Sequence, residues 1–327
     1  IEQDNDRRLT IMTATFIPCG AKLPVIAMMG GVMTSYVTRS YKAGGLMAPC
    51  MYFIGIVAVL VAAIILKKTK PFSGKPAPFV MELPQYHIPS AKTVLLHVWE
   101  RLKGFIIKAG TIILVCNTVV QIMQSFNTHF QVVEEGMENT SILAAVASPF
   151  AYLLVPIVGV AAWQLAAAAI TGFIAKENVV GTIATVYGMT SLISTEDNEL
   201  IGSGSDVAAI IGITKVAALA YLMFNLYTPP CFAALGALNS ELQSGKWLLG
   251  AICLQLATGF SVGFIVYQVG TLVTTGSLGA GFVGGLIAVL VFAAVIAGLI
   301  IRANKQIDTE YAVSYTHLRA HETLANL

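Results

Sequence analysis

Three cysteines in this 327-residue sequence follow a proline directly, and two of them precede a short apolar stretch. Cys19 lies in TFIPCGAKLPVIA, after Pro18, and Cys231 lies in NLYTPPCFAALGAL. We expect Pro230 at the first position of a helix and Cys231 in its first turn, where the helix dipole favours a thiolate. Thiolate sulfur is a soft ligand that suits first-row transition ions better than Na⁺, Mg²⁺ or Ca²⁺. The repeated Pro-Cys arrangement therefore predicts that Cys19 and Cys231 bind a metal ion of this kind.

The remaining cysteines stand in ordinary apolar surroundings, at Cys50, Cys116 and Cys253. Buried cysteine commonly packs as a small hydrophobe, and this interpretation remains the alternative for Cys19 and Cys231 as well. No two cysteines have the CxxC spacing or the crowding of a secreted disulfide scaffold. We therefore expect all five cysteines to be reduced thiols.

Lys22 is the first charged residue that an apolar segment must accommodate. It lies near the middle of the apolar stretch 11–35, where an ammonium group costs at least about 2.5 to 3.5 kcal/mol on insertion scales. Pro18 and Pro24 each remove a backbone donor, and lipid cannot satisfy the carbonyl groups that this frees. We therefore predict a broken helix at this point, facing a cavity.

Lys176 and Glu177 form a second polar interruption, in TGFIAKENVVGT. The apolar run on either side is too short to cross a bilayer alone, so we predict a discontinuous helix whose break is permitted by Gly172 and Gly181. The alternative is a hairpin of two short helices with both charges at the inner membrane surface. In both segments a threonine, a Phe-Ile pair and an Ala-Lys pair occur in this order, and the patterns end at Lys22 and at Lys176. Paired broken segments of this kind point to a transport site in the membrane.

The composition indicates a membrane protein. Hydrophobic residues make up 56% of the chain and charged residues 11%, against roughly 25% charged in a soluble domain. A net charge of +2, without a dense basic patch, argues against a nucleic-acid partner. Apolar stretches of about 20 residues predict an all-α polytopic integral membrane protein with about eight transmembrane helices. These lie near residues 11–35, 44–66, 105–123, 142–159, 161–189, 207–227, 247–269 and 282–301.

The charges between the predicted spans set the orientation. Segment 67–103 is rich in Lys and Arg, whereas segment 124–141 carries glutamates and no Lys or Arg. The positive-inside rule places 67–103 in the cytoplasm, and 124–141 and the acidic loop 195–199 outside. The stretch AKTVLLHVWERLKGFI has apolar residues at helical spacing with basic residues between them. It predicts an amphipathic helix on the inner membrane surface.

Both ends of the sequence are unusual. The chain opens at Ile1 with the polar run IEQDNDRRLT and shows no signal-peptide pattern, so we expect a fragment of a longer protein. From about residue 313 the segment VSYTHLRAHETLANL resembles translated sequencing-adapter read-through, and we expect it to be non-native. The spacing of His317 and His321 within it therefore carries no metal-site prediction.

Three motifs, in this order, resemble the membrane domain of the bacterial ferrous iron transporter B family: FIPCGAKLPVIA, TGFIAKENVVGT and YTPPCFAALGAL. The resemblance covers about residues 1–270 and implies two gate repeats of broken helices. It implies that Cys19 and Cys231 lie on the Fe²⁺ path, and that the gate or pathway residues are Pro18, Lys22, Pro24, Lys176, Glu177 and Pro230. It also implies a bacterial cytoplasmic (inner) membrane, a small cytoplasmic iron-transport partner protein and a possible homo-oligomer.

The resemblance divides the chain into five parts. Residues 1–66 are the remainder of the first gate repeat and the following span, 67–103 the cytoplasmic loop with its amphipathic helix, 104–240 the second gate repeat region, 241–302 the C-terminal transmembrane helices and 303–327 the tail. The family's GxxxxGK[ST] loop does not occur here, so GTP and Mg²⁺ would act only through an N-terminal G domain. The family's earlier gate motif, with its own cysteine, would precede Ile1.

We therefore expect the membrane part of a GTP-regulated Fe²⁺ importer, incomplete at its N-terminus and not itself an enzyme. A gate-domain carrier of nucleosides or organic anions is an alternative that should line its helix N-termini with Ser, Thr and Asn. A non-transporting membrane scaffold is another, and it would tolerate leucine at Lys22 and Glu177. No nucleophile and base pair stands within the spans, which argues against an intramembrane enzyme.

Overall fold

The structure, a computed structural model, describes residues 4–34, 42–69, 71–72, 90–134, 137–187 and 211–325. Helices dominate these ranges, and the only β-pairing in them is two isolated bridges, Phe126 with Val132 and Asn127 with Ser141. The all-α prediction is therefore confirmed. The acidic loop at 195–199 and most of the proline-rich part of 67–103 lie outside the described residues.

The described residues form α-helices and two short 3₁₀ helices. In chain order they are α1 (Asp4–Ala14), the 3₁₀ helix η1 (Gly20–Lys22), α2 (Leu23–Thr34), α3 (Lys42–Lys67), α4 (Ala91–Ser125), the 3₁₀ helix η2 (Glu138–Thr140), α5 (Ile142–Val158), α6 (Trp163–Ile174), α7 (Asn178–Val186), α9 (Lys215–Tyr227), α10 (Phe232–Leu242), α11 (Gly245–Thr275) and α12 (Phe282–Ala325).

Four helical segments are long and apolar enough to cross a membrane, namely 47–67, 215–242, 245–275 and 282–303. The pair α5 and α6, bent by 101° at a short break, raises the number to five among the described residues. The protein is therefore a multi-pass membrane protein. The number eight stays a prediction, because several of the expected spans are broken into helices that are individually too short to qualify.

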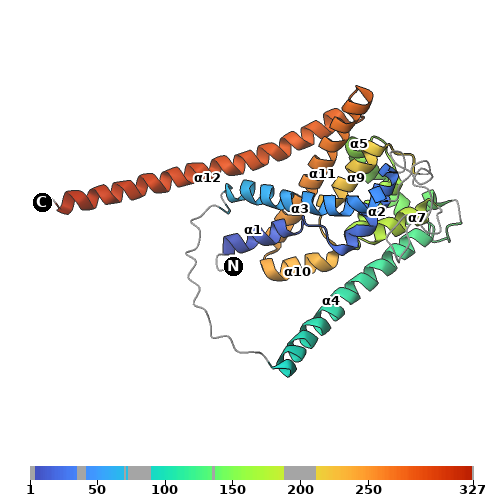
Figure 1. The fold of residues 1–327 in the computed structure, drawn as a ribbon, viewed down its shortest axis with the longest axis horizontal. Coiled ribbons are helices and arrows are strands. Elements are labelled where there is room, and N and C mark those ends of the chain that lie inside the picture. The colour runs from blue at the N-terminus through green and yellow to red at the C-terminus, as the bar shows by residue number, and fades with distance from the viewer. Residues whose placement is uncertain are drawn as a thin grey trace.

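Helix α9 lies at the centre of the bundle, packed against α2, α5 and α11 (Figure 1). Small residues let its neighbours approach, since Ala217, Ala218 and Ala220 have no exposed surface. Tyr221 is also fully buried, and its hydroxyl donates a hydrogen bond of 2.9 Å to the Leu165 carbonyl oxygen of α6. A fully enclosed central helix of this kind fixes the positions of the helices around it.

The outer helices present apolar side chains to their surroundings. Along α3 the large exposed residues recur at helical spacing, at Phe53, Val57, Leu60 and Ile64. An apolar stripe that packs on no other part of the protein suits a lipid environment, where backbone groups must be satisfied within the helix. The long helices α4 and α12 project from the bundle in different directions (Figure 1).

One prediction about a helix boundary needs correction. The amphipathic stretch predicted at the end of 67–103 is helical, but it continues into the following span as the single 35-residue helix α4. Within 91–125 it is therefore not a separate helix, and no proline interrupts the chain there. Helix α12 continues from the last span to Ala325, and the non-native origin of the tail stays a prediction.

Glycines 259 and 263 of α11 explain how closely α11 and α9 pack. A Cβ atom on Gly259 would lie 3.1 Å from the Phe224 carbonyl oxygen, and one on Gly263 would lie 3.2 Å from the Ala220 carbonyl oxygen. Small residues four apart allow such backbone contact between membrane helices. The contact with Phe224 lies near the end of α9, which also contributes residues to the candidate functional site.

We expect the double variant Gly259→Ala, Gly263→Ala to destabilise the protein by about 1 to 3 kcal/mol, because overpacking would separate α11 from α9. Thermal unfolding in detergent measures the effect. The matched control is Gly250→Ala on the same helix, where a Cβ atom meets nothing within 4 Å. Alanine has the higher helix propensity, so this control should be neutral or slightly stabilising. Equal melting temperatures for the double variant and the wild type would contradict the packing argument.

Candidate functional site

The first predicted break is present between α1 and α2. Cys19 has an extended backbone (φ −83°, ψ 166°) and is the N-cap of the short 3₁₀ helix Gly20–Lys22. Pro18 is buried, and α3 passes so closely that a Cβ atom on Gly55 would lie 2.8 Å from the Pro18 ring. Pro24 lies in the first turn of α2, so its missing donor breaks no hydrogen bond within that helix, contrary to the expectation from the sequence.

The second predicted break separates α6 from α7, with Lys176 and Glu177 between them. Ala175 is extended (φ −147°, ψ 123°) where α6 ends. A Cβ atom on Gly172 would collide with the Val179 side chain, so this glycine allows α6 and α7 to come together. A Cβ atom on Gly181 would meet nothing within 4 Å, and only the first of the two glycines is therefore needed for close packing.

The third break lies between α9 and α10. Thr228 is extended (φ −67°, ψ 157°), as a residue before proline must be. Cys231 is the N-cap of α10 (φ −61°, ψ 162°), and α10 begins at Phe232. The predictions that Pro230 is the first residue of this helix and that Cys231 lies in its first turn are therefore wrong, because the extended chain continues to Cys231 before the helix begins. Cys19 and Cys231 are thus equivalent, each an extended N-cap directly after a proline.

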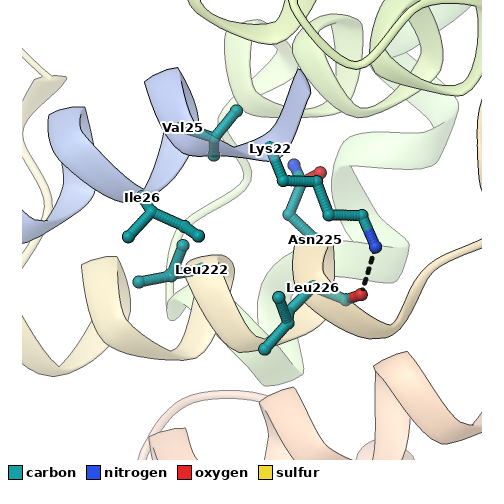
Figure 2. Close-up of a pocket in the computed structure, with 6 residues that line it drawn as sticks. All are labelled: Lys22, Val25, Ile26, Leu222, Asn225 and Leu226. Carbon is teal, nitrogen blue, oxygen red and sulfur yellow. Dashed lines mark hydrogen bonds between the residues drawn. The ribbon is translucent and has the colours of Figure 1, made fainter. Parts of the chain in front are cut away.

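Lys22 and Lys176, from the first two breaks, both reach the end of α9 at the third break. The Lys22 ammonium donates to the Leu226 carbonyl oxygen over 2.6 Å (Figure 2). The Lys176 ammonium donates to the Thr228 hydroxyl over 2.9 Å and to the Asn225 side-chain oxygen over 3.5 Å. Both lysines are almost fully buried, 4% and 2% exposed. The three interruptions therefore meet at one polar centre.

The last turn of α9 is arranged to present oxygen atoms to this centre. The Tyr221 hydroxyl donates to the Leu165 carbonyl oxygen over 2.9 Å, which joins this part of α9 to α6. The Asn225 amide oxygen faces Lys176, whose ammonium lies 3.5 Å away. The Thr228 hydroxyl donates to the Asn225 carbonyl oxygen over 2.9 Å, so its lone pairs remain available to Lys176.

Aromatic contacts join the breaks as well. Phe16 packs edge to face on Tyr227 with 5.7 Å between ring centroids, and Phe173 packs in the same way on Phe232 with 5.0 Å. Phe16 and Phe173 both belong to the pattern of a Phe-Ile pair and an Ala-Lys pair that the first two breaks share. Each half of the predicted repeat therefore contacts the third break through one phenylalanine and one lysine.

The two motif cysteines lie at the edge of this centre. Cys19 is exposed, Cys231 is partly exposed, and both are near enough to Lys22 and Lys176 to interact with their charges. Among the described residues, no group of three or more His, Cys, Asp and Glu is placed to hold a metal ion. Two thiols alone are an incomplete ligand set, so further ligands must be of another kind.

One predicted residue, Glu177, lies apart from the lysine centre, and two residues of the centre were not predicted. Glu177 is exposed and makes no hydrogen bond or ion pair with another described residue, and its gate role stays a prediction. Sequence reasoning missed Asn225 and Thr228 as lysine partners. The available signal was two polar residues in the last turn of an apolar helix, directly before Pro229.

Comparison with known proteins identifies families that the chain resembles. Residues 48–101 match the family described as ferrous iron transport protein B C terminus, and residues 106–245 match the Gate family, described as nucleoside recognition. The Fe(2+) transporter FeoB of Staphylococcus aureus (strain COL) is 32% identical over 277 residues, covering 83% of this chain and 38% of that protein. The Fe(2+) transporter FeoB of Escherichia coli (strain K12) is 29% identical over 354 residues, covering 95% and 44%. No solved structure matches the chain.

The fold and the site define an all-α, multi-pass membrane protein with a Gate region built from broken helices. Over most of its length the chain is homologous to the FeoB Fe(2+) transporters. It spans less than half of the length of these relatives.

We expect Gly172→Ala to disturb the second break, because the new methyl group would push α7 away from α6 and withdraw Lys176 from α9. Overpacking of this kind costs about 1 to 3 kcal/mol. The matched control is Gly181→Ala, which adds the same methyl group to α7 in open space. Thermal unfolding of both variants in detergent measures the difference. A Gly172 variant as stable as the Gly181 variant would contradict the close packing at this break.

Proposed function

We propose that the chain forms the Fe²⁺-conducting membrane part of a ferrous iron importer. The observation that carries the proposal is that Cys19 and Cys231, both N-caps after a proline, lie beside the point where three helix breaks meet. Homology to Fe(2+) transporters supports Fe²⁺ as the transported ion. Breaks of this kind are the usual places where membrane transporters bind an ion, because freed backbone groups can face a polar path there.

The direction of transport in this proposal uses the predicted orientation, with the acidic loops outside and the basic segment inside. Under this proposal Fe²⁺ enters from the acidic outer loops, exchanges part of its water shell for the two thiols and leaves toward the basic inner surface. Thiolate sulfur discriminates against Mg²⁺ and Ca²⁺, which prefer oxygen ligands.

The same arrangement supports a metal ion better than an organic solute. A nucleoside carrier needs hydrogen-bonding side chains at the helix N-termini that face its substrate, and the N-caps at the first and third breaks are cysteines. The description of the Gate family as nucleoside recognition is therefore not carried over to this chain.

Further parts of the proposal concern the whole transporter. GTP and Mg²⁺ would act through an N-terminal G domain outside the sequence described here, and this chain would have no catalytic role of its own. A small cytoplasmic partner protein, a homo-oligomer and a location in the bacterial cytoplasmic membrane belong to the same proposal. Movement of one set of broken helices against the other would then open the path alternately to each side.

Uptake of radiolabelled Fe²⁺ under reducing conditions tests the proposal, in cells that lack their own importer and express the gene that encodes this chain. We expect the double variant Cys19→Ser, Cys231→Ser to lose at least about ten-fold in uptake at equal membrane abundance, because a serine hydroxyl is a much weaker ligand than a thiolate. The matched control is Cys50→Ser, Cys253→Ser, two exposed cysteines on α3 and α11. Equal uptake by both double variants would remove the cysteines from the path, and no uptake by the wild type would overturn the proposed function.

A further inference from the structure

The end of α9 gathers more oxygen atoms than the fold requires for itself. The Leu226 carbonyl, the Asn225 side-chain amide and the Thr228 hydroxyl each direct an oxygen at a buried ammonium group. A helix C-terminus also carries a partial negative charge from its unpaired carbonyl groups. These features together attract cations, and no carboxylate takes part in the described contacts.

The cations bound at the end of α9 are two ammonium groups of the protein itself. An ammonium group is a compact positive charge that binds carbonyl and hydroxyl oxygens, as a metal ion does. Among the described residues, Lys22 and Lys176 supply six N–H donors to three acceptor atoms. Their charges are also close enough to repel each other. Two partly satisfied, mutually repelling charges are held here at the expense of stability.

We propose that these three oxygens form a binding site for a divalent cation, and that the ammonium groups of Lys22 and Lys176 occupy the site in the state that the structure describes. The proposal rests on Fe²⁺ transport as the proposed function and deepens it. Cation binding and lysine binding are then mutually exclusive, so the two lysines close the path when no cation is present.

The ligand chemistry fits a borderline ion such as Fe²⁺. The two motif thiols alone do not complete a coordination shell, and the oxygens of Leu226, Asn225 and Thr228, which bind the two lysines, offer further ligands. Cys19 and Cys231 lie within electrostatic range of both lysines, so sulfur and oxygen ligands share one locality. A mixed shell of sulfur and neutral oxygen suits Fe²⁺ better than Mg²⁺ or Ca²⁺.

The space beside one of the three oxygens is small. Lys22 borders a cavity that is lined mostly by apolar side chains, with Val25, Ile26, Leu222, Asn225 and Leu226 around it (Figure 2). The cavity has room for about one water molecule. A fully hydrated ion therefore does not fit beside Leu226, and an ion that binds the Leu226 carbonyl oxygen must first lose water.

Equilibrium binding of Co²⁺ to the purified protein in detergent, under reducing conditions, tests the proposal. The double variant Lys22→Leu, Lys176→Leu frees the oxygens without adding a ligand, and we expect its Kd for Co²⁺ to fall at least ten-fold. Addition of Thr228→Val to this variant should raise the Kd again. The matched control is Lys92→Leu, Lys246→Leu, two exposed lysines that should leave the Kd unchanged. Unchanged or weaker Co²⁺ binding by the buried-lysine variant overturns the proposal.

A second measurement uses the wild-type protein and covers the case in which the leucine variant fails to fold. Co²⁺ should displace both ammonium groups, so Lys22 and Lys176 should react faster with an amine-labelling reagent when Co²⁺ is present, as read by mass spectrometry. Equal labelling with and without Co²⁺ overturns the proposal. Wild-type Fe²⁺ uptake is measured in parallel, so that uptake without lysine displacement refutes the site alone, and displacement without uptake refutes the transport function alone.

Discussion

The end of α9 is the constraint on which the rest of the site depends. Pro229 and Pro230 stop the helix inside an apolar bundle, where water is not at hand for its last carbonyl groups. These groups must therefore be satisfied by the protein. Lys22 donates to the Leu226 carbonyl oxygen, and the Thr228 hydroxyl, which also accepts a hydrogen bond from Lys176, donates to the Asn225 carbonyl oxygen. The two lysines come from different interruptions of the chain. A break that would be unstable alone is stable because the other two breaks exist.

This mutual dependence also limits how the protein can move. The helices themselves are stabilised by their own hydrogen bonds, and the small residues between α9 and α11 hold those two helices tightly together. The joints at Cys19, Lys176 and Cys231 depend instead on a few polar and aromatic contacts. Movement concentrates where contacts are few, so the helix breaks are the natural hinges and the α9–α11 pair is the fixed part.

Sequence patterns located the breaks because charge and proline inside apolar runs violate the rules of membrane helices. Lys22, Lys176 and both Pro-Cys pairs were all found in this way. The partners of the lysines were not, because Lys22 and Leu226 are 204 positions apart and no local pattern links them. The start of α10 was predicted at Pro230, too early in the chain, because sequence alone does not show how far the extended chain continues past a proline pair. The role of Gly259 likewise depends on which helix lies opposite it.

Lysine, rather than arginine, suits a site that must release its occupant. A guanidinium group is planar, offers five donors in a fixed fork and binds two oxygens at once, so it would hold the end of α9 firmly. An ammonium group is a point charge on a flexible stem, and it can leave its acceptors by rotation about single bonds. Lys22 holds a single described oxygen, and Lys176 holds one at 2.9 Å and a second at 3.5 Å. Few and separate hydrogen bonds make exchange with an arriving ion possible, whereas a bidentate clamp would favour a permanently closed end of the helix.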